Sequence, residues 1–317
     1  MRRLWIPFLA AFPMAMTMIV ELPLTQRFFL PPPETVRELT EVSRSAPAPK
    51  PPVIRDVVYH RDLLRRYHLD IYGPLPAEDG AAIDQPALQS AAPVIVFYHG
   101  GSWLRGDKIT IMVIHRFLER LRREGWFVVS VNYTTSVLRG LGGPVNNATV
   151  ALEWVHANAQ RYGWDPRRVG LYGVSAGGHV ALMAAAAGPE TALVLAECAP
   201  TDLEAMRHGE AFENSSSFAV FPSWRLRALS PVHAVSQDYP PVLIYHGDAD
   251  RTVDYRQAER LEAALTAVGG EVTLVRYPGG NHAFLNYSDQ QWYEQETRAI
   301  AWMNEHFSSI EPPGRPR

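Results

Sequence analysis

The feature that most constrains the fold of this chain is an alternation of short apolar runs with longer segments of helical periodicity, which begins near residue 53. Several short runs, such as "VIVFY" and "VLIY", are continuously apolar, which is typical of strands buried on both faces of a parallel sheet. We expect strands over residues 54–59, 67–72, 94–98, 126–132, 169–173, 193–196, 242–246 and 271–277. We expect helices over residues 109–124, 144–162, 176–187, 255–268 and 290–306. This order predicts an α/β fold: a doubly wound, mostly parallel eight-stranded sheet with helices on both faces.

The residues outside this alternation have a different character. Two arginines follow Met1 and precede an apolar run over residues 4–20, a pattern typical of an export signal or a membrane anchor. We therefore interpret residues 1–30 as such a segment, with an apolar helix lying on the domain as the alternative. The positive-inside rule would then place the domain outside, either membrane-anchored and facing outward or exported (periplasmic or secreted). Residues 31–52 are predicted to be a proline-rich linker, 53–310 one domain, and 311–317 a disordered tail.

Composition narrows the partners of this domain. The net charge of −3 and the lack of a Lys/Arg-rich block argue against nucleic acid as a partner. Cys198 is the single cysteine in the sequence, which rules out an intrachain disulfide and a thiolate metal cluster. We see no pattern that calls for a metal or a cofactor, and the sequence leaves the oligomeric state open.

The five residues "GVSAG" around Ser175 end one of the expected strands and begin an expected helix. This spacing fits the G-x-S-x-G elbow, in which a sharp strand-to-helix turn exposes a nucleophilic serine. Gly173 and Gly177 would allow the tight turn and close packing of strand against helix. A serine in an ordinary turn is the competing interpretation, because a match of five residues arises readily by chance.

Three other expected strands also end in polar, chemically suggestive segments. "HGGSW" follows residues 94–98, "GDADRTV" follows 242–246, and "PGGNHAF" follows 271–277. Because ligands bind beyond the carboxyl ends of the strands in such sheets, we expect all four segments to meet at one rim. That convergence favours a nucleophilic Ser175 over a turn serine.

With these motifs in this order, residues from about 53 to 307 resemble the α/β-hydrolase fold. Within that fold, the chain is similar to esterases related to hormone-sensitive lipase, to bacterial acetyl-ester hydrolases and to arylformamidases. The resemblance implies a catalytic triad of Ser175 as nucleophile, His282 as general base and acid, and Asp250 as the acid that orients the histidine. Asp248 competes for the acid position, and Asp254 is a weaker third candidate.

The same resemblance implies an oxyanion hole and a pocket. The oxyanion hole would be formed by the backbone N–H groups of Gly100, Gly101 and Ala176, and Trp103 would bind substrate beside it. His99 and His246 are expected to support their loops. His179, on the helix after the elbow, is expected to be a packed or solvated helix residue.

Residues 203–229 interrupt the alternation, and we expect them to form a small cap insertion. Their aromatic residues would line an acyl or leaving-group pocket or pack on the sheet: Phe212, Phe218, Phe221 and Trp224. A small cap favours short acyl chains. The sequence thus predicts a hydrolase of small-molecule carboxylic esters that acts through an acyl-enzyme. The alternatives are a serine peptidase or formamidase of the same fold, or a binding protein without activity.

Overall fold

The computed structural model describes residues 53–63, 65–75, 91–109, 115–135, 140–208 and 221–310. All of them belong to the second of two units into which the chain divides, Pro51–Arg317. The predicted signal or anchor (1–30), linker (31–52) and tail (311–317) lie outside the described residues. No helix within the described residues is both long and apolar enough to cross a membrane.

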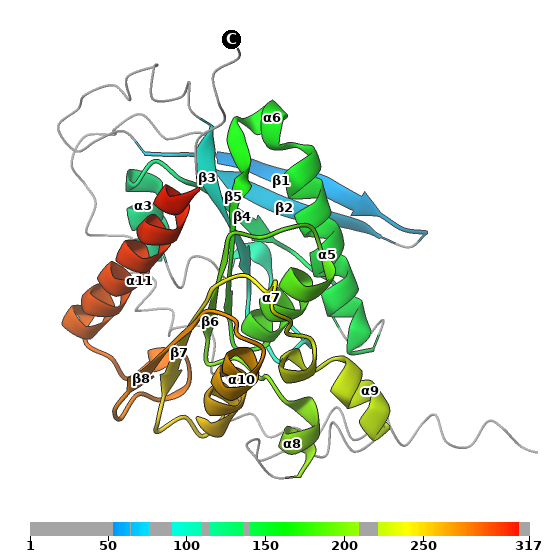
Figure 1. Cartoon of the computed structure of the whole chain (residues 1–317). Coiled ribbons are helices and arrows are strands. Elements are labelled where there is room, and N and C mark those ends of the chain that lie inside the picture. Colours follow the sequence, from blue (N-terminus) through cyan, green and yellow to red (C-terminus); the bar gives the residue numbers. More distant parts are fainter. Residues whose placement is uncertain are drawn as a thin grey trace, which may run out of the picture. The chain divides into compact units, whose positions relative to one another are not determined.

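The described residues form an eight-stranded, mostly parallel sheet, which confirms the predicted fold class (Figure 1). The strands are β1 (Val53–Arg61), β2 (Arg66–Tyr72), β3 (Ala92–Tyr98), β4 (Phe127–Val131), β5 (Trp164–Val174), β6 (Leu193–Glu197), β7 (Val242–Gly247) and β8 (Val272–Tyr277). Their order in the sheet is β1-β2-β4-β3-β5-β6-β7-β8. Strand β2 pairs antiparallel with both β1 and β4, whereas all the other neighbouring pairs, from β4-β3 to β7-β8, are parallel.

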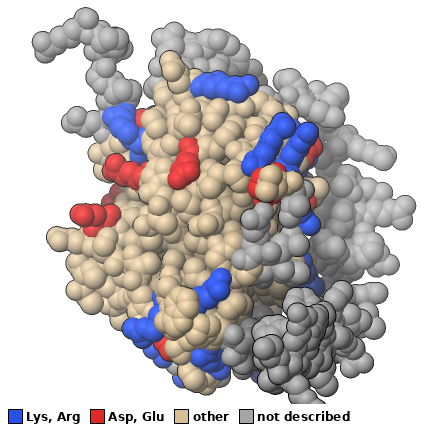
Figure 2. Space-filling model, turned by 90° about the vertical axis from the view of Figure 1, so that its right-hand side faces the viewer, with Lys and Arg blue, Asp and Glu red and all other residues tan. Residues whose placement is uncertain are grey.

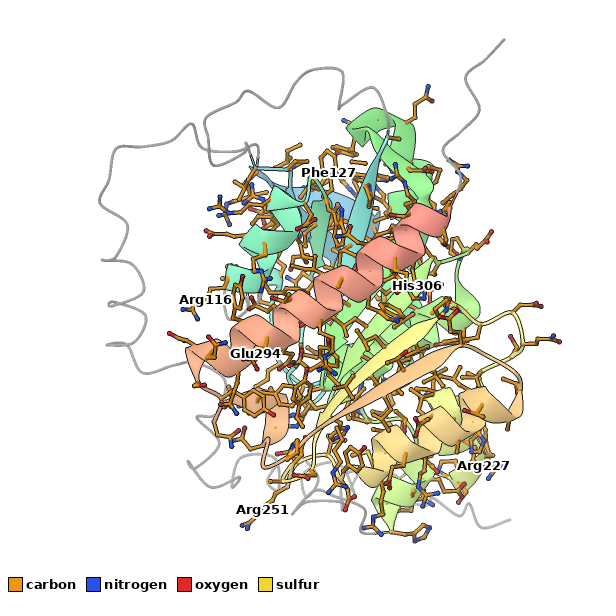
Figure 3. The ribbon with its side chains drawn as sticks, turned by 60° about the vertical axis from the view of Figure 1, so that its left-hand side comes forward. Arg116, Phe127, Arg227, Arg251, Glu294 and His306 are labelled. Atoms are coloured by element: carbon orange, nitrogen blue, oxygen red, sulfur yellow. The ribbon has the colours of Figure 1, made fainter. Side chains whose placement is uncertain are left out.

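Helices cover both faces of the sheet. The described helices are α3 (His115–Arg123), α5 (Gly142–Ala157), α6 (Ala159–Tyr162), α7 (Ala176–Ala187), α8 (Leu203–Arg207), α9 (Ser223–Ala228), α10 (Arg256–Ala267) and α11 (Asp289–Ser309). Helices α5, α7 and α10 lie on one face and α3 and α11 on the other (Figure 1); Figure 3 shows α11 running across its face.

Side chains of β3 show how the two cores form. Val94, Val96 and Tyr98 are buried in the core that includes α5 and α7. Ile95 and Phe97 are buried in the opposite core, which includes α3 and α11. Because successive side chains of a strand point to opposite faces, a continuously apolar run is required when both faces are covered.

Apart from small shifts at the ends of other elements, two predicted elements differ from the observed ones. The single helix expected over residues 144–162 is divided at Asn158, whose side chain donates to the carbonyl of Trp154 (2.8 Å) and competes with the helical pattern. Strand β5 begins at Trp164, five residues before the expected start, because Trp164 is itself a core residue whose indole N–H bonds to Val155 O (3.0 Å). The helix expected from residue 109 is described only from His115.

The described part of residues 203–229, the expected cap insertion, contains α8 and α9. Ser230 joins its two ends, because the Ser230 hydroxyl accepts from Leu203 N–H (2.9 Å) and donates to Leu226 O (2.7 Å). Of the aromatic residues expected to line a pocket, Trp224 is 70% exposed and Phe221 is half-buried against the core. Phe212 and Phe218 lie outside the described residues.

The surface carries charges of both signs. On the face shown in Figure 2, Lys and Arg are scattered among Asp, Glu and uncharged residues. This face presents no broad area of a single charge among the described residues.

Candidate active site

The turn at Ser175 has the backbone of a nucleophile elbow. Ser175 lies between β5 and α7 with φ 56° and ψ −125°, a sparsely populated region for a residue with a side chain. Both flanking glycines are required by contact: a Cβ on Gly173 would collide with the backbone of Gly177, and one on Gly177 would collide with the Tyr98 carbonyl. The sequence prediction that these glycines permit a tight elbow agrees with this packing.

Three of the predicted site residues form one continuous hydrogen-bond chain. His282 Nε2 lies 2.9 Å from Ser175 Oγ, and His282 Nδ1 lies 2.7 Å from Asp250 Oδ2. The three residues are only 5% to 9% exposed. They come from the ends of β5, β7 and β8, as expected from the convergence of strand ends at one rim.

The carboxylate of Asp250 is held by four groups. Its Oδ1 accepts the backbone N–H groups of Thr252 (2.7 Å) and Val253 (2.9 Å). Its Oδ2 contacts His282 and also lies 3.4 Å from Nε2 of His246. Burial by itself would raise the pKa of Asp250, but the hydrogen bonds from His246 and His282 outweigh it and hold that pKa well below its ordinary value. Asp250 is therefore an ionised partner for His282 at neutral pH.

The other two candidate acids are turned away from His282. Asp248 accepts from the Arg276 guanidinium (2.9 Å) and from Gly279 N–H (2.7 Å). Asp254 pairs with Arg256 (2.9 Å). Arg251, next to the buried Asp250, is exposed and points outward (Figure 3). The geometry thus selects Asp250 among the three.

The "HGGSW" segment lies directly against the nucleophile. A Cβ built on Gly100 would be 3.5 Å from Ser175 Cβ. Gly101 has φ +126°, and its carbonyl accepts from Leu104 and Arg105 N–H (3.0 and 3.1 Å), which closes a turn over residues 101–105. Ala176 is the first residue of α7, where helix geometry provides no intrahelical acceptor for its N–H. These positions fit an oxyanion hole, and the role of the three N–H groups stays a prediction.

The turn is supported from two sides. His99 is fully buried, its Nδ1 lies 2.7 Å from Gly100 O, and its ring stacks on Tyr133 with centroids 4.2 Å apart. Trp103 is 4% exposed, and its indole N–H donates to Nδ1 of His179 (3.1 Å). The prediction that Trp103 contacts substrate is untested by this geometry, which shows its N–H engaged within the protein.

Two buried residues at the site, His179 and Glu197, were not predicted from the sequence to belong to it. His179 is fully buried rather than solvated, and it contacts Trp103. Its position four residues after Ser175, on the same face of α7, was the available signal. Glu197 is 3% exposed at the end of β6, and its carbonyl accepts Ser175 N–H (2.8 Å). For Glu197, the available signal was a charged residue at the end of a continuously apolar run.

Glu197 and Cys198 are buried, ionisable residues outside the triad, and burial raises the pKa of each. Burial raises the pKa of Glu197 to about 7, although the Tyr172 hydroxyl donates to its side chain (2.9 Å) and acts in the opposite direction. Cys198 has φ +42°, and burial raises the pKa of its thiol. Ligating atoms of Cys198, Asp250 and His282 lie within 4.8 Å of one another. This spacing would suit a metal ion, but Asp250 and His282 already bond to each other, and we assign both to the hydrogen-bond chain.

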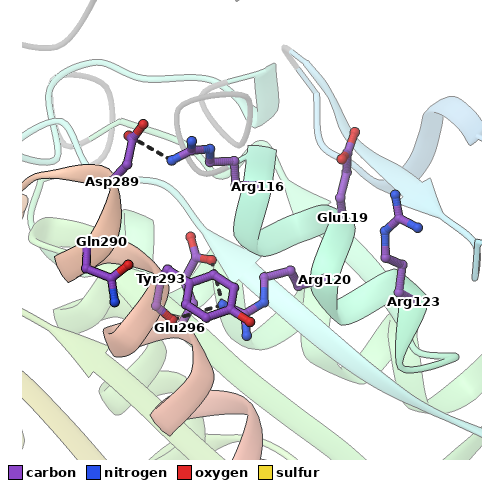
Figure 4. Close-up of a pocket in the computed structure, with 8 residues that line it drawn as sticks. All are labelled: Arg116, Glu119, Arg120, Arg123, Asp289, Gln290, Tyr293 and Glu296. Atoms are coloured by element: carbon purple, nitrogen blue, oxygen red, sulfur yellow. Dashed lines mark hydrogen bonds and ion pairs between the residues drawn. The ribbon is translucent and has the colours of Figure 1, made fainter. Parts of the chain in front are cut away.

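A pocket of about 410 Å³ lies elsewhere, between α3 and α11 (Figure 4). Four of its charged residues form two ion pairs: Arg116 with Asp289 (2.8 Å) and Arg120 with Glu296 (3.0 Å). None of the predicted site residues lines it. We therefore place the candidate active site at Ser175.

The sheet order and the elbow define this protein as an α/β-hydrolase. The family model BD-FAE matches residues 83–265, more than half of the chain. The chain belongs to the BD-FAE family, among the α/β-hydrolase esterases similar to hormone-sensitive lipase.

Several curated relatives are esterases of Mycobacterium tuberculosis. Esterase LipC is 27% identical over 265 residues, covering 75% of this chain and 64% of LipC. Carboxylesterase NlhH is 28% identical over 229 residues, covering 64% of this chain and 70% of NlhH. Esterase LipQ is 29% identical over 215 residues, covering 61% of this chain and 50% of LipQ. The chain thus spans about half to two thirds of the length of LipQ and LipC.

Solved structures share the fold. A truncated carbohydrate esterase from gut microbiota superposes with a TM-score of 0.67 at 21% identity, over 83% of this chain and all of that one. The propionate-bound esterase Est2 of Thermogutta terrifontis gives a TM-score of 0.63 at 22% identity, over 84% of this chain and 97% of that one.

Proposed function

We propose that this protein is a serine hydrolase that cleaves carboxylic esters of small molecules. The observation that carries the proposal is the unbroken hydrogen-bond chain from Ser175 through His282 to Asp250. A serine hydroxyl is a weak nucleophile at neutral pH, and a histidine in contact with it supplies the base it needs. The relatives named as esterases support the ester as the bond cleaved.

The reaction would begin with attack of Ser175 Oγ on the acyl carbonyl while His282 Nε2 takes the hydroxyl proton. The N–H groups of Gly100, Gly101 and Ala176 would stabilise the negative charge that develops on the carbonyl oxygen. Asp250 would stabilise the imidazolium of His282, which then gives its proton to the leaving alcohol.

The second half of the reaction would regenerate the enzyme. His282 removes a proton from a water molecule as that water attacks the acyl group on Ser175. The new tetrahedral intermediate collapses as His282 returns its proton to Ser175 Oγ. The carboxylic acid then leaves, and the hydrogen-bond chain from Ser175 to Asp250 is restored.

We propose short acyl chains as the preferred substrates. The insertion contributes only short helices among its described residues, α8 with five residues and α9 with six, which fits a small cap. The structure of the neighbour Est2 was solved with propionate, a three-carbon acid. We further propose that residues 1–30 export the domain or anchor it facing outward, which fractionation with N-terminal sequencing would test.

The experiment is a substrate screen on the full chain and on Ser175→Ala. We expect wild type to hydrolyse p-nitrophenyl acetate and butyrate faster than a long-chain ester, and to react with a fluorophosphonate probe. Ser175→Ala should lose both properties. A wild type that is inactive on esters and is not labelled by the probe would overturn the proposal. Selective cleavage of formanilides or aminoacyl amides would instead indicate a formamidase or a peptidase.

A further inference from the structure

The turn that follows Gly100 has an unusual backbone. Gly101, Ser102 and Trp103 have φ values of +126°, +54° and +58°. Positive φ is uncommon for residues with a side chain, and a bulky aromatic residue in this region is a genuine outlier. Such conformations are strained and persist only where surrounding contacts enforce them. The contacts of Trp103 therefore bear on the geometry of the Gly100–Gly101 segment.

Trp103 is held by His179 through two kinds of contact. Its indole N–H donates to His179 Nδ1 (3.1 Å), and the two rings meet edge to face with centroids 5.1 Å apart. Both side chains are buried, Trp103 with 4% exposure and His179 with none. Water therefore competes little for the bond.

The other side of the His179 ring reaches the insertion. His179 Nε2 lies 2.7 Å from the carbonyl oxygen of Leu229, the last residue of the 203–229 insertion. The next residue, Ser230, joins the two ends of that insertion by its hydroxyl. The backbone N–H of His179 also bonds to Ser175 O (3.2 Å). His179 thus contacts the elbow at Ser175, the turn over residues 101–105 through Trp103, and, at Leu229, the base of the expected insertion.

These contacts determine the tautomer of His179. An indole N–H can only donate, so Nδ1 must be the unprotonated acceptor. Nε2 then carries the proton, which it donates to Leu229 O. A single neutral tautomer therefore satisfies both bonds at once. Burial lowers the pKa of His179 to about 4, against the opposing effect of the Leu229 carbonyl, which agrees with a neutral ring at pH 7.

We propose that His179 is a positioning residue for ester hydrolysis: its neutral Nε2–H form clamps Trp103, and thereby the strained turn behind Gly100 and Gly101, to the base of the insertion. The proposal rests on the proposed function, because the N–H groups it positions are those of the oxyanion hole. Loss of one donor typically costs about 10²–10³ in rate, so a displaced turn should cost a substantial part of that.

The test is a double-mutant cycle on the full chain with Trp103→Phe, His179→Phe and the double variant. Trp103→Phe deletes the indole N–H and keeps an aromatic ring, so it also serves if His179→Phe does not fold. We expect each single variant to lower kcat for p-nitrophenyl acetate about 10-fold to 100-fold, with KM within about 3-fold. The double variant should be no slower than the slower single one, because both remove the same interaction.

Two further variants separate positioning from general loss of stability. His179→Gln offers a carbonyl acceptor and an amide donor, and should recover part of the lost kcat. Tyr239→Phe removes a different buried hydrogen bond to the same helix, from its hydroxyl to Leu182 O, and should lower the melting temperature without lowering kcat. The indole N–H resonance of Trp103, identified as the one absent from Trp103→Phe, should shift in His179→Phe and stay closer to its wild-type position in His179→Gln.

Two outcomes have distinct meanings. If wild type is active and Trp103→Phe leaves kcat unchanged, or if the two losses multiply in the double variant, the positioning role of His179 is overturned while the proposed function stands. A wild type that is inactive on every ester would overturn the proposed function, and the role of His179 with it.

Discussion

His282 Nδ1 lies 2.7 Å from Asp250 Oδ2, while the other oxygen of that carboxylate accepts two backbone N–H groups. This arrangement fixes which ring nitrogen of His282 faces Ser175. An amide at position 250 would present a donor to Nδ1 and favour the wrong tautomer. We expect Asp250→Asn to lower kcat about 10³-fold to 10⁴-fold in a p-nitrophenyl acetate assay.

Asp248→Asn is the matched control. Asp248 lies two residues earlier on the same loop, but its carboxylate bonds to Arg276 and Gly279. Asp248→Asn should change kcat by less than about 3-fold, because an amide oxygen can still accept Gly279 N–H and the lost ion pair with the exposed Arg276 carries little energy. Equal losses in the two variants would show that the loop as a whole, rather than the Asp250 carboxylate, supports activity.

Gly101→Ala should reduce activity strongly. Gly101 has φ +126°, and a Cβ there would collide with the Arg105 carbonyl that the turn brings against it. The turn must therefore open, which moves the N–H groups beside Ser175. We expect kcat to fall at least about 100-fold, measured by ester hydrolysis in a protein that keeps its circular dichroism spectrum.

Gly142→Ala is the comparison for that variant. Gly142 begins α5, and a Cβ there meets no heavy atom within 4 Å. It should leave kcat unchanged. If Gly101→Ala were as active as Gly142→Ala, the turn would not position a catalytic donor.

Buried His179 should make the protein less stable in acid. Burial lowers its pKa from 6.5 to about 4. Above pH 6.5 the ring of residue 179 is neutral in both the folded and the unfolded chain, and its contribution to the free energy of unfolding is complete. As the pH falls toward 4, this ring binds a proton in the unfolded chain but not in the folded one, so that contribution is lost. Between pH 7 and 4.5, the free energy of unfolding of wild type should fall by about 2–3 kcal/mol relative to His179→Gln.

Urea unfolding at pH 7, 6, 5 and 4.5 measures this difference. His99 is retained in both proteins; burial lowers its pKa in the same way, so it contributes equally to the two curves. Parallel curves for wild type and His179→Gln would contradict the prediction.

Glu197 should act with the opposite sign. Burial raises its pKa to about 7, so its folded form retains a proton that the unfolded chain has lost. The contribution of Glu197 to the free energy of unfolding is favourable below about pH 4.5 and is lost as the pH rises through 7. Glu197→Gln, which can still accept from the Tyr172 hydroxyl, should gain up to about 3 kcal/mol of stability relative to wild type between pH 5 and 8.5.

Glu305→Gln on α11 is the control for Glu197→Gln, because Glu305 is exposed. Its stability relative to wild type should not change across the same range. A pH-independent effect of Glu197→Gln in urea unfolding would show that Glu197 keeps the same charge in the folded and unfolded chains.

Much of the fold was predictable because its signals are local. The apolar run over 94–98 specifies a strand buried on both faces, and the glycines around Ser175 specify a tight strand-to-helix turn. The break at Asn158 was missed, because a side-chain bond to Trp154 competes with an otherwise helical pattern. The eight strands agree in number and position with the prediction, apart from differences at their ends.

The sequence by itself determined which polar residues stand at strand ends, since periodicity and backbone conformation depend on near neighbours. Only the tertiary structure decided which of them meet. His282 contacts Ser175 across 107 residues, and of three aspartates after one strand only Asp250 faces His282. Trp103 reaches His179 across 76 residues. Such pairings depend on how strands and loops pack in space, and no spacing within one segment encodes them.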